Sequence, residues 1–140
     1  MKTRYTLDFF DEPDFIILAI NSHAKAYKLC WYLNKKLHFD FAKTTDHKIG
    51  EKLWFSRYWY NDQLHEIEYE LFSNRSKNGY LLPSQKGVNF LLKINKTIKK
   101  REKEEFIQKL LQIPEILLIF ELDLNKIKQL DRFIFNDKKN

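Results

Sequence analysis

A run of basic side chains is the residue pattern with the clearest chemical meaning. Six lysine or arginine residues fall between positions 93 and 103, at Lys93, Lys96, Lys99, Lys100, Arg101 and Lys103. Cations grouped where a strand meets a helix can contact nucleic-acid phosphates. Glutamates are interspersed among them, so the ordinary alternative is a solvated start of a helix.

Arg57 could add stacking side chains to the same surface, because it lies in the aromatic stretch 53–60. Aromatic rings beside cations are typical of proteins that bind unpaired nucleic acid. Aromatic strands are more often part of a core, and the glycine-containing signature of RNA-recognition motifs is absent. We predict an RNA-binding site formed by Arg57, Lys93, Lys96, Lys99, Lys100, Arg101 and Lys103.

Other residue types give no pattern typical of an enzyme or a metal site. The histidines share no ligand spacing, and they stand at His23, His38, His47 and His65. Three separate glycines cannot form a phosphate-cradling loop. We therefore expect no metal, no cofactor, no catalysis and no small-molecule substrate. A hydrolase would need two or more of four residues to converge in one pocket: Asp46, His47, His65 and Asp123.

Length and composition predict one soluble domain. The 140 residues include 44% apolar and 16% aromatic side chains, enough to form a real core. The net charge of +6 permits an acidic partner, although lysine is abundant throughout, together with Asn and Ile. The single cysteine, Cys30, excludes an internal disulfide and falls on an apolar helical stripe, where it should be a core residue. No signal peptide or membrane-spanning run is evident, which favours the cytoplasm.

Hydrophobic periodicity predicts strands and helices in the order ββαββββαβ. The strands cover 5–9, 15–20, 39–41, 53–60, 65–71, 88–94 and 116–120, and the helices cover 24–37 and 97–112. We expect an α+β fold, a two-layer sandwich of a mostly antiparallel sheet and two main helices, spanning 1–135, with a frayed tail at 136–140. A ferredoxin-like arrangement with an inserted hairpin is the nearest analogy.

Several local features refine this prediction. Ser22 and Thr97 are suited to cap the two helices, and Pro114 should end the second one. The apolar run 116–120 is expected to be a central, buried strand. Glu66, Glu68 and Glu70 alternate with apolar residues and are predicted to face solvent. The stretch 133–135 is predicted to close the core.

The end of the chain resembles the signature of a bacterial family. Ile113-Pro114-Glu115, the apolar run after it and Leu122-Asp123-Leu124 are similar to the C-terminal signature of the IPExxxVDY family. The segments 29–35, 80–83 and 89–92 resemble its first helix and middle section. In this chain the final tyrosine of the signature is replaced by leucine, or the spacing differs. The resemblance implies a small cytoplasmic protein of a family without an assigned biochemical activity.

These observations favour a non-enzymatic cytoplasmic binding protein that associates with structured RNA or with a ribonucleoprotein particle such as the ribosome. The alternative is a protein-protein interaction or self-associating module without nucleic acid. In that case a partner would contact the aromatic strand 53–60 or the apolar stretch 133–135. No membrane partner is expected.

Overall fold

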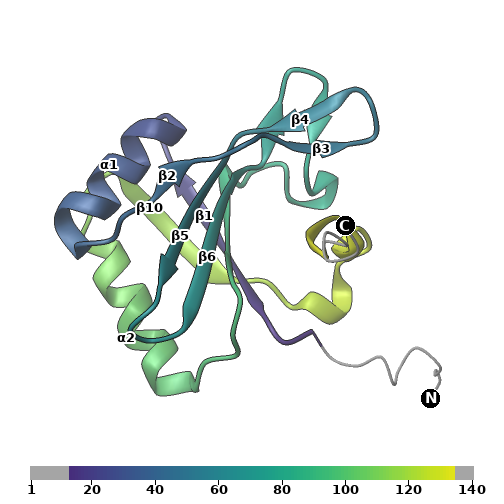
Figure 1. Ribbon diagram of the computed structural model, residues 1–140. Helices are drawn as coiled ribbons and strands as arrows, with labels where there is room; N and C mark the ends of the chain where they lie inside the picture. The colour runs from purple at the N-terminus through teal and green to yellow at the C-terminus, as the bar shows by residue number, and fades with distance from the viewer. Residues whose placement is uncertain (1–12, 135–140) are drawn as a thin grey trace, which may run out of the picture.

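A computed structural model describes residues 13–134, which form a six-stranded sheet with two helices against one face (Figure 1). In sheet order the strands are β10 (Ile116–Glu121), β1 (Ile16–Ser22), β9 (Phe90–Ile94), β6 (Ile67–Ser73), β5 (Arg57–Asp62) and β2 (Ala42–Lys43). The helices are α1 (Ala26–Leu37) and α2 (Lys100–Leu111). The predicted α+β class is confirmed. The predicted strand 5–9 lies outside the described residues.

Smaller elements extend from this sheet. Two short hairpins are formed by β3 (His47–Ile49) with β4 (Leu53–Phe55), and by β7 (Arg75–Ser76) with β8 (Gly79–Tyr80). Within residues 13–134 there are also three short turns of 3-10 helix, η2 (Pro83–Gln85), η3 (Leu124–Lys126) and η4 (Leu130–Phe133). Neither α-helix in the described part of the chain is long and apolar enough to cross a membrane.

Two interleaved β-α-β units make up the topology. Neighbouring strands are all antiparallel, so β1 and β6 are parallel to each other with β9 between them, and the chain between the two contains α1 followed by β2 to β5. In the same way α2 connects the parallel strands β9 and β10, with β1 between them. β5 is an additional strand that pairs with β6, as the predicted hairpin requires. This order agrees with a ferredoxin-like arrangement that carries an inserted hairpin.

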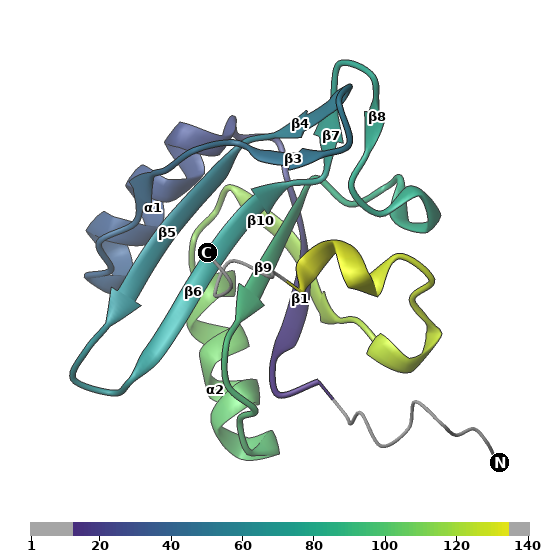
Figure 2. The same cartoon turned by 45° about the vertical axis from the view of Figure 1, so that its right-hand side comes forward.

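Apolar side chains fill both faces of the sheet. On β1, Ile16, Leu18 and Ile20 pack with residues of α1 and α2, whereas Ile17 and Ala19 point to the opposite face. There the C-terminal segment 124–133 returns across the sheet, and Phe133 is fully buried in this second core (Figure 2). A strand that is buried on both faces reads as a continuous apolar run, which explains the sequence of β1.

β10 is an edge strand, so the prediction of a central strand is wrong. It pairs with β1, and no other strand among residues 13–134 lies along its outer side. Ile116 and Ile119 are buried, but Leu117, Leu118 and Phe120 are exposed by 55%, 49% and 38%. An apolar run indicates a strand, but it does not reveal how many neighbours that strand has.

We expect substitutions on β10 to show this asymmetry. Leu117→Thr should change the free energy of unfolding by less than about 0.5 kcal/mol, because the side chain is largely exposed and threonine suits a strand. Ile119→Val should cost about 1 kcal/mol, because it removes a buried methylene. Urea denaturation measures both changes. A larger loss for Leu117→Thr than for Ile119→Val would contradict the observed orientation.

The helices begin later than predicted, and neither expected cap is present. The residues before the first turns are Lys25 and Lys99, and neither side chain caps its helix. Ser22 instead accepts a hydrogen bond from the amide of Ala24 through its hydroxyl, at 3.1 Å. Within α1, Cys30 is buried as predicted, and burial raises the pKa of its thiol to about 12. This cysteine is a core residue.

Candidate nucleic-acid interface

Two of the predicted RNA-binding residues belong to a buried ionic cluster. Arg57, Glu70 and Lys93 come from the neighbouring strands β5, β6 and β9. The Arg57 guanidinium contacts the Glu70 carboxylate at 2.7 and 2.9 Å, and the Lys93 ammonium lies 3.8 Å from that carboxylate. Glu70 and Lys93 are each only 6% exposed. Glu70 therefore does not face solvent as predicted, and burial removes Lys93 from any phosphate-binding surface.

The C-terminal segment accounts for the burial of Lys93. The Lys93 ammonium donates a hydrogen bond to the carbonyl oxygen of Phe133 at 2.6 Å and lies 4.6 Å from the centre of the Phe15 ring. Burial lowers the pKa of Lys93, and the charge of Glu70 partly opposes that effect. This cluster fixes the C-terminal segment on the sheet, so its role is structural.

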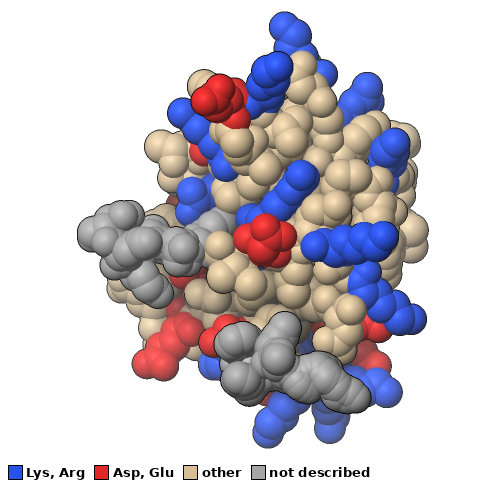
Figure 3. Space-filling view, turned by 90° about the vertical axis from the view of Figure 1, so that its right-hand side faces the viewer, with Lys and Arg blue, Asp and Glu red and all other residues tan. Residues whose placement is uncertain are grey.

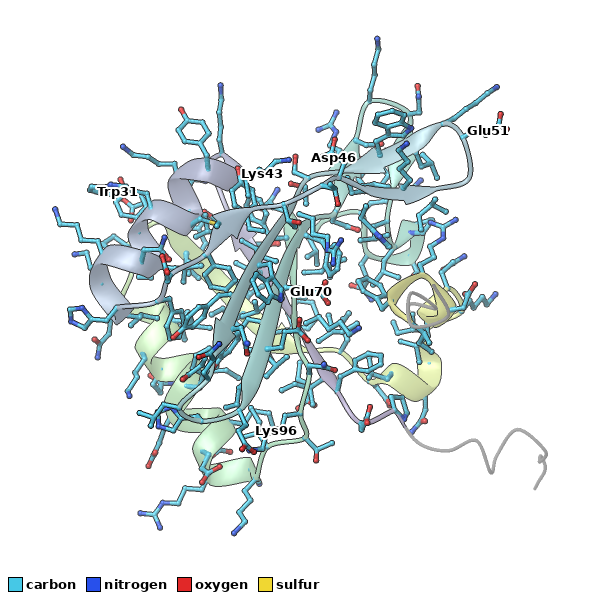
Figure 4. The ribbon with its side chains drawn as sticks, in the orientation of Figure 1. Trp31, Lys43, Asp46, Glu51, Glu70 and Lys96 are labelled. Atoms are coloured by element: carbon cyan, nitrogen blue, oxygen red, sulfur yellow. The ribbon has the colours of Figure 1, made fainter. Side chains whose placement is uncertain are left out.

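The other predicted cations lie around the start of α2, away from the buried cluster. Figure 4 shows Glu70 in the middle of the sheet and Lys96 beyond its end, close to α2. Lys103 forms an ion pair of 2.7 Å with Glu121 on β10, and Arg101 lies 3.7 Å from Glu105. The remaining cations of the predicted set are exposed: Lys96, Lys99 and Lys100. The predicted site is thus divided between two locations and does not form one surface.

Basic side chains are also common elsewhere on the molecule. Figure 3 shows lysine and arginine over much of one face, with fewer acidic groups among them. A group of cations at the start of α2 is therefore not distinctive by itself. A nucleic-acid surface needs a further property, such as exposed aromatic rings in a region free of carboxylates.

The outer side of α1 has exposed aromatic rings, and the helix itself carries no carboxylate, although Glu115 is hydrogen-bonded to Tyr32 of the same helix. Trp31 is 47% exposed and Tyr27 is 64% exposed. The ammonium groups of Lys28 and Lys35 lie 4.9 and 4.7 Å from the centre of the Trp31 ring, one on each side of it along the helix. Figure 4 shows Trp31 pointing away from the sheet. We call the set Lys25, Tyr27, Lys28, Trp31 and Lys35 the α1 surface.

The periodicity of α1 produces this surface. Leu29, Cys30 and Leu33 form the buried stripe, so residues 28, 31 and 35 lie on the opposite side at helical spacing. No aspartate or glutamate occurs between positions 23 and 39, whereas four lysines do. Lysine stems that cover a tryptophan also shield it from water, which is the ordinary structural role of such contacts. The absence of carboxylates in this stretch is what distinguishes the surface.

A cleft of about 670 Å³ continues the α1 surface at the start of the helix. Lys25 and Tyr27 line it together with Tyr58 of β5 and Arg75 of β7, and no aspartate or glutamate of residues 13–134 is among its lining residues. Burial raises the pKa of Tyr58, so its hydroxyl stays protonated at neutral pH and can donate a hydrogen bond. We call this cavity the α1 cleft. The cations Lys25 and Arg75 and the Tyr58 hydroxyl are hydrogen-bond donors of the kind that bind a phosphate.

The residues required for a hydrolase do not converge. His47 contacts the carbonyl oxygen of Arg132 at 2.7 Å, while His65 contacts the carboxylate of Asp62 at 2.8 Å. Asp46 pairs with Lys43, and Asp123 accepts a hydrogen bond from the amide of Asn125. Among residues 13–134 there is also no group of three or more side chains placed to hold a metal ion.

One part of this interface has a signal in the sequence, and another has none. The spacing of Lys28, Trp31 and Lys35 in a stretch without aspartate or glutamate indicates the α1 surface, although these residues face away from the core. Arg75 enters the α1 cleft only through the pairing of distant strands. Comparison with models of known protein families and with curated proteins finds no match to this chain, and the resemblance to the IPExxxVDY family stays a prediction.

Proposed function

We propose that the protein is a non-enzymatic, cytoplasmic binding protein that associates with structured RNA, alone or in a ribonucleoprotein particle, through the α1 surface and the α1 cleft. The observation that carries this proposal is Trp31, exposed between two lysine ammonium groups on a helix without carboxylates. Loops and bulges of structured RNA offer unpaired bases beside phosphates. The unpaired bases of such a target can stack on the aromatic rings of the α1 surface while its phosphates contact the neighbouring lysines.

Each part of the surface has a distinct task in this proposal. Trp31 and Tyr27 stack on unpaired bases, because both rings are accessible. Lys28 and Lys35 contact the phosphates on either side, and seven residues of helix separate them by about 10 Å. Arg75 receives a further phosphate in the α1 cleft, where a planar guanidinium can form two parallel hydrogen bonds.

Salt dependence of RNA binding tests the proposal. We expect the purified protein to bind an RNA hairpin with an unpaired loop more tightly than the matching loop-free duplex. The logarithm of the affinity should fall with the logarithm of salt with a slope of about −3, at roughly 0.7 per phosphate for the four cations Lys25, Lys28, Lys35 and Arg75. Fluorescence anisotropy of labelled RNA measures both. Absence of binding at about 50 mM salt, or an affinity that does not change with salt concentration, would contradict the proposal.

Protein-protein association is the second candidate, and β10 is the observation that favours it. Three exposed apolar side chains on an edge strand are typical of a surface that pairs with another chain. Phe133 is buried in the protein's own core, so the stretch 133–135 does not offer that residue to a partner. Light scattering tests this candidate. Self-association that Leu118→Lys abolishes would support it, and a monomer at every concentration would count against it.

A further inference from the structure

A second cavity, of about 440 Å³, lies where the C-terminal ends of α1 and α2 meet the turn between β5 and β6. Its wall is formed by Phe39, Tyr69 and Phe106, and Lys36 and Lys109 stand among its polar lining residues. We call it the helix-end pocket. Its volume falls in the range of small-molecule sites, roughly 300–1,000 Å³. It is separate from the α1 surface, since none of its lining residues belongs to that set.

The three aromatic rings form a continuous apolar wall. The centre of the Phe39 ring lies 5.3 Å from that of Tyr69 and 6.1 Å from that of Phe106, and the last two are 6.0 Å apart. Phe39 and Phe106 are partly exposed, whereas Tyr69 is buried. Burial raises the pKa of the Tyr69 phenol to about 12, so the wall carries no charge at neutral pH. These rings suit a flat apolar ligand.

The polar part of the pocket is positive. Lys36 and Lys109 are exposed, and among residues 13–134 neither forms an ion pair with a carboxylate. Asp62 is the one carboxylate in the lining, and it is bonded to the His65 ring at 2.8 Å and to the His65 amide at 3.2 Å. Lysines also stabilise the ends of helices. An anionic ligand here would meet two ammonium groups and one carboxylate, that of Asp62, which is already hydrogen-bonded to His65.

Unusual backbone conformations coincide with this pocket. His38 and Glu66 are the two non-glycine residues of the described chain with a positive φ, of 60° and 58°. His38 lines the pocket, and Glu66 lies between His65 and Ile67, which also line it. Such conformations are uncommon outside glycine and are concentrated at ligand sites. His38 is also the left-handed residue that ends α1, a common way for a helix to end, so Glu66 has the less expected conformation of the two.

We propose that the helix-end pocket binds a small organic anion with a flat aromatic body, such as an aromatic carboxylate. The ring lies against Phe39, Tyr69 and Phe106, and the carboxylate lies between the ammonium groups of Lys36 and Lys109. The aromatic wall supplies contact area, and the two cations fix the orientation of the ligand. This activity is additional to RNA binding and independent of it.

Titration with naphthoate tests the site, with naphthalene carboxamide as the uncharged probe of the same shape. We expect saturable shifts of the His38 and His65 ring signals in NMR spectra with naphthoate, and weaker binding of the carboxamide. The double variant Lys36→Met, Lys109→Met should bind naphthoate roughly tenfold more weakly, because it loses both charge-assisted contacts. Both substitutions are at exposed positions and retain the apolar stems, so the fold should remain intact.

The matched control is Lys99→Met, Lys100→Met, which removes two exposed charges at the opposite end of α2. It should bind naphthoate as the original protein does. Absence of saturable shifts at either histidine overturns the site. Equal binding of naphthoate and the carboxamide, or equal loss in the control variant, overturns the role of Lys36 and Lys109.

Discussion

Replacement of Glu70 by alanine is expected to lower the free energy of unfolding by about 3–5 kcal/mol, the usual cost of breaking a buried ion pair from one side. Glu70 is 6% exposed, and its single negative charge contacts both Arg57 and Lys93. Its removal leaves the buried Lys93 ammonium with the Phe133 carbonyl oxygen but without that opposite charge. Desolvation of a cation is costly in the absence of an opposite charge.

Urea denaturation measures this loss, and two further variants identify its cause. Glu70→Ala combined with Lys93→Met should be more stable than Glu70→Ala alone, because the buried ammonium is then removed as well. Glu104→Ala changes an exposed carboxylate and should stay within about 0.5 kcal/mol of the original protein. A loss below about 1 kcal/mol for Glu70→Ala, or no recovery in the double variant, would contradict the ionic cluster.

The pH dependence of this loss has a defined sign. Burial lowers the pKa of Lys93 in the folded protein, and the charge of Glu70 opposes that shift. Between the folded and the ordinary lysine pKa the unfolded chain binds more protons, so folding becomes more favourable as pH rises. Without Glu70 the pKa of Lys93 in the folded protein should fall further, so the pH range over which stability rises with pH extends to lower pH. The destabilisation caused by Glu70→Ala should therefore shrink as pH rises from 7 toward about 10.

Replacement of Trp31 by alanine is expected to weaken RNA binding by about 1–3 kcal/mol, the usual contribution of one stacked base. The ring is 47% exposed between Lys28 and Lys35, so it can stack without rearrangement of the core. The free energy of unfolding should change by less than about 1 kcal/mol. Trp31→Phe should retain most of the affinity, because it keeps an aromatic face.

Trp54 provides a matched control for Trp31. It is 50% exposed, and the Lys48 ammonium lies 4.4 Å from the centre of its ring, but it stands on β4 outside the α1 surface. Trp54→Ala should leave the affinity for the RNA hairpin unchanged. Equal losses for Trp31→Ala and Trp54→Ala in fluorescence anisotropy would show that stacking is not confined to the α1 surface.

The local elements of the fold can be predicted from the sequence, because each depends on neighbouring residues. The continuous run of β1 and the apolar stripe of α1 each identify an element. The place of a strand in the sheet is a property of distant pairings. β10 is at the edge because it pairs with β1 on one side, as Leu118 does with Asn21, and no strand among residues 13–134 pairs with its other side. An apolar sequence does not contain this information.

The candidate site likewise has local features, which the sequence predicts, and features that depend on distant contacts, which it does not. Alternation along β6 correctly places Glu68 and Glu70 on one face, since they pair with Asn61 and Trp59 of β5. Whether that face is buried depends on Phe133, which returns forty positions after Lys93 to cover it. The α1 surface is local and could be predicted from helical spacing. The α1 cleft needs Arg75, which the tertiary fold brings to α1.

Charge reversal of matched lysine pairs tests most directly whether α1 is the RNA-binding element. Lys28→Glu, Lys35→Glu changes the α1 surface, and Lys99→Glu, Lys100→Glu changes lysines that are also exposed, at the start of α2. For the RNA hairpin, we predict that the α1 pair lowers the affinity at least about tenfold and reduces the salt slope by roughly 1.4, at 0.7 per phosphate. The α2 pair should have a much smaller effect. An α2 pair that abolishes binding while the α1 pair leaves it unchanged would contradict this account.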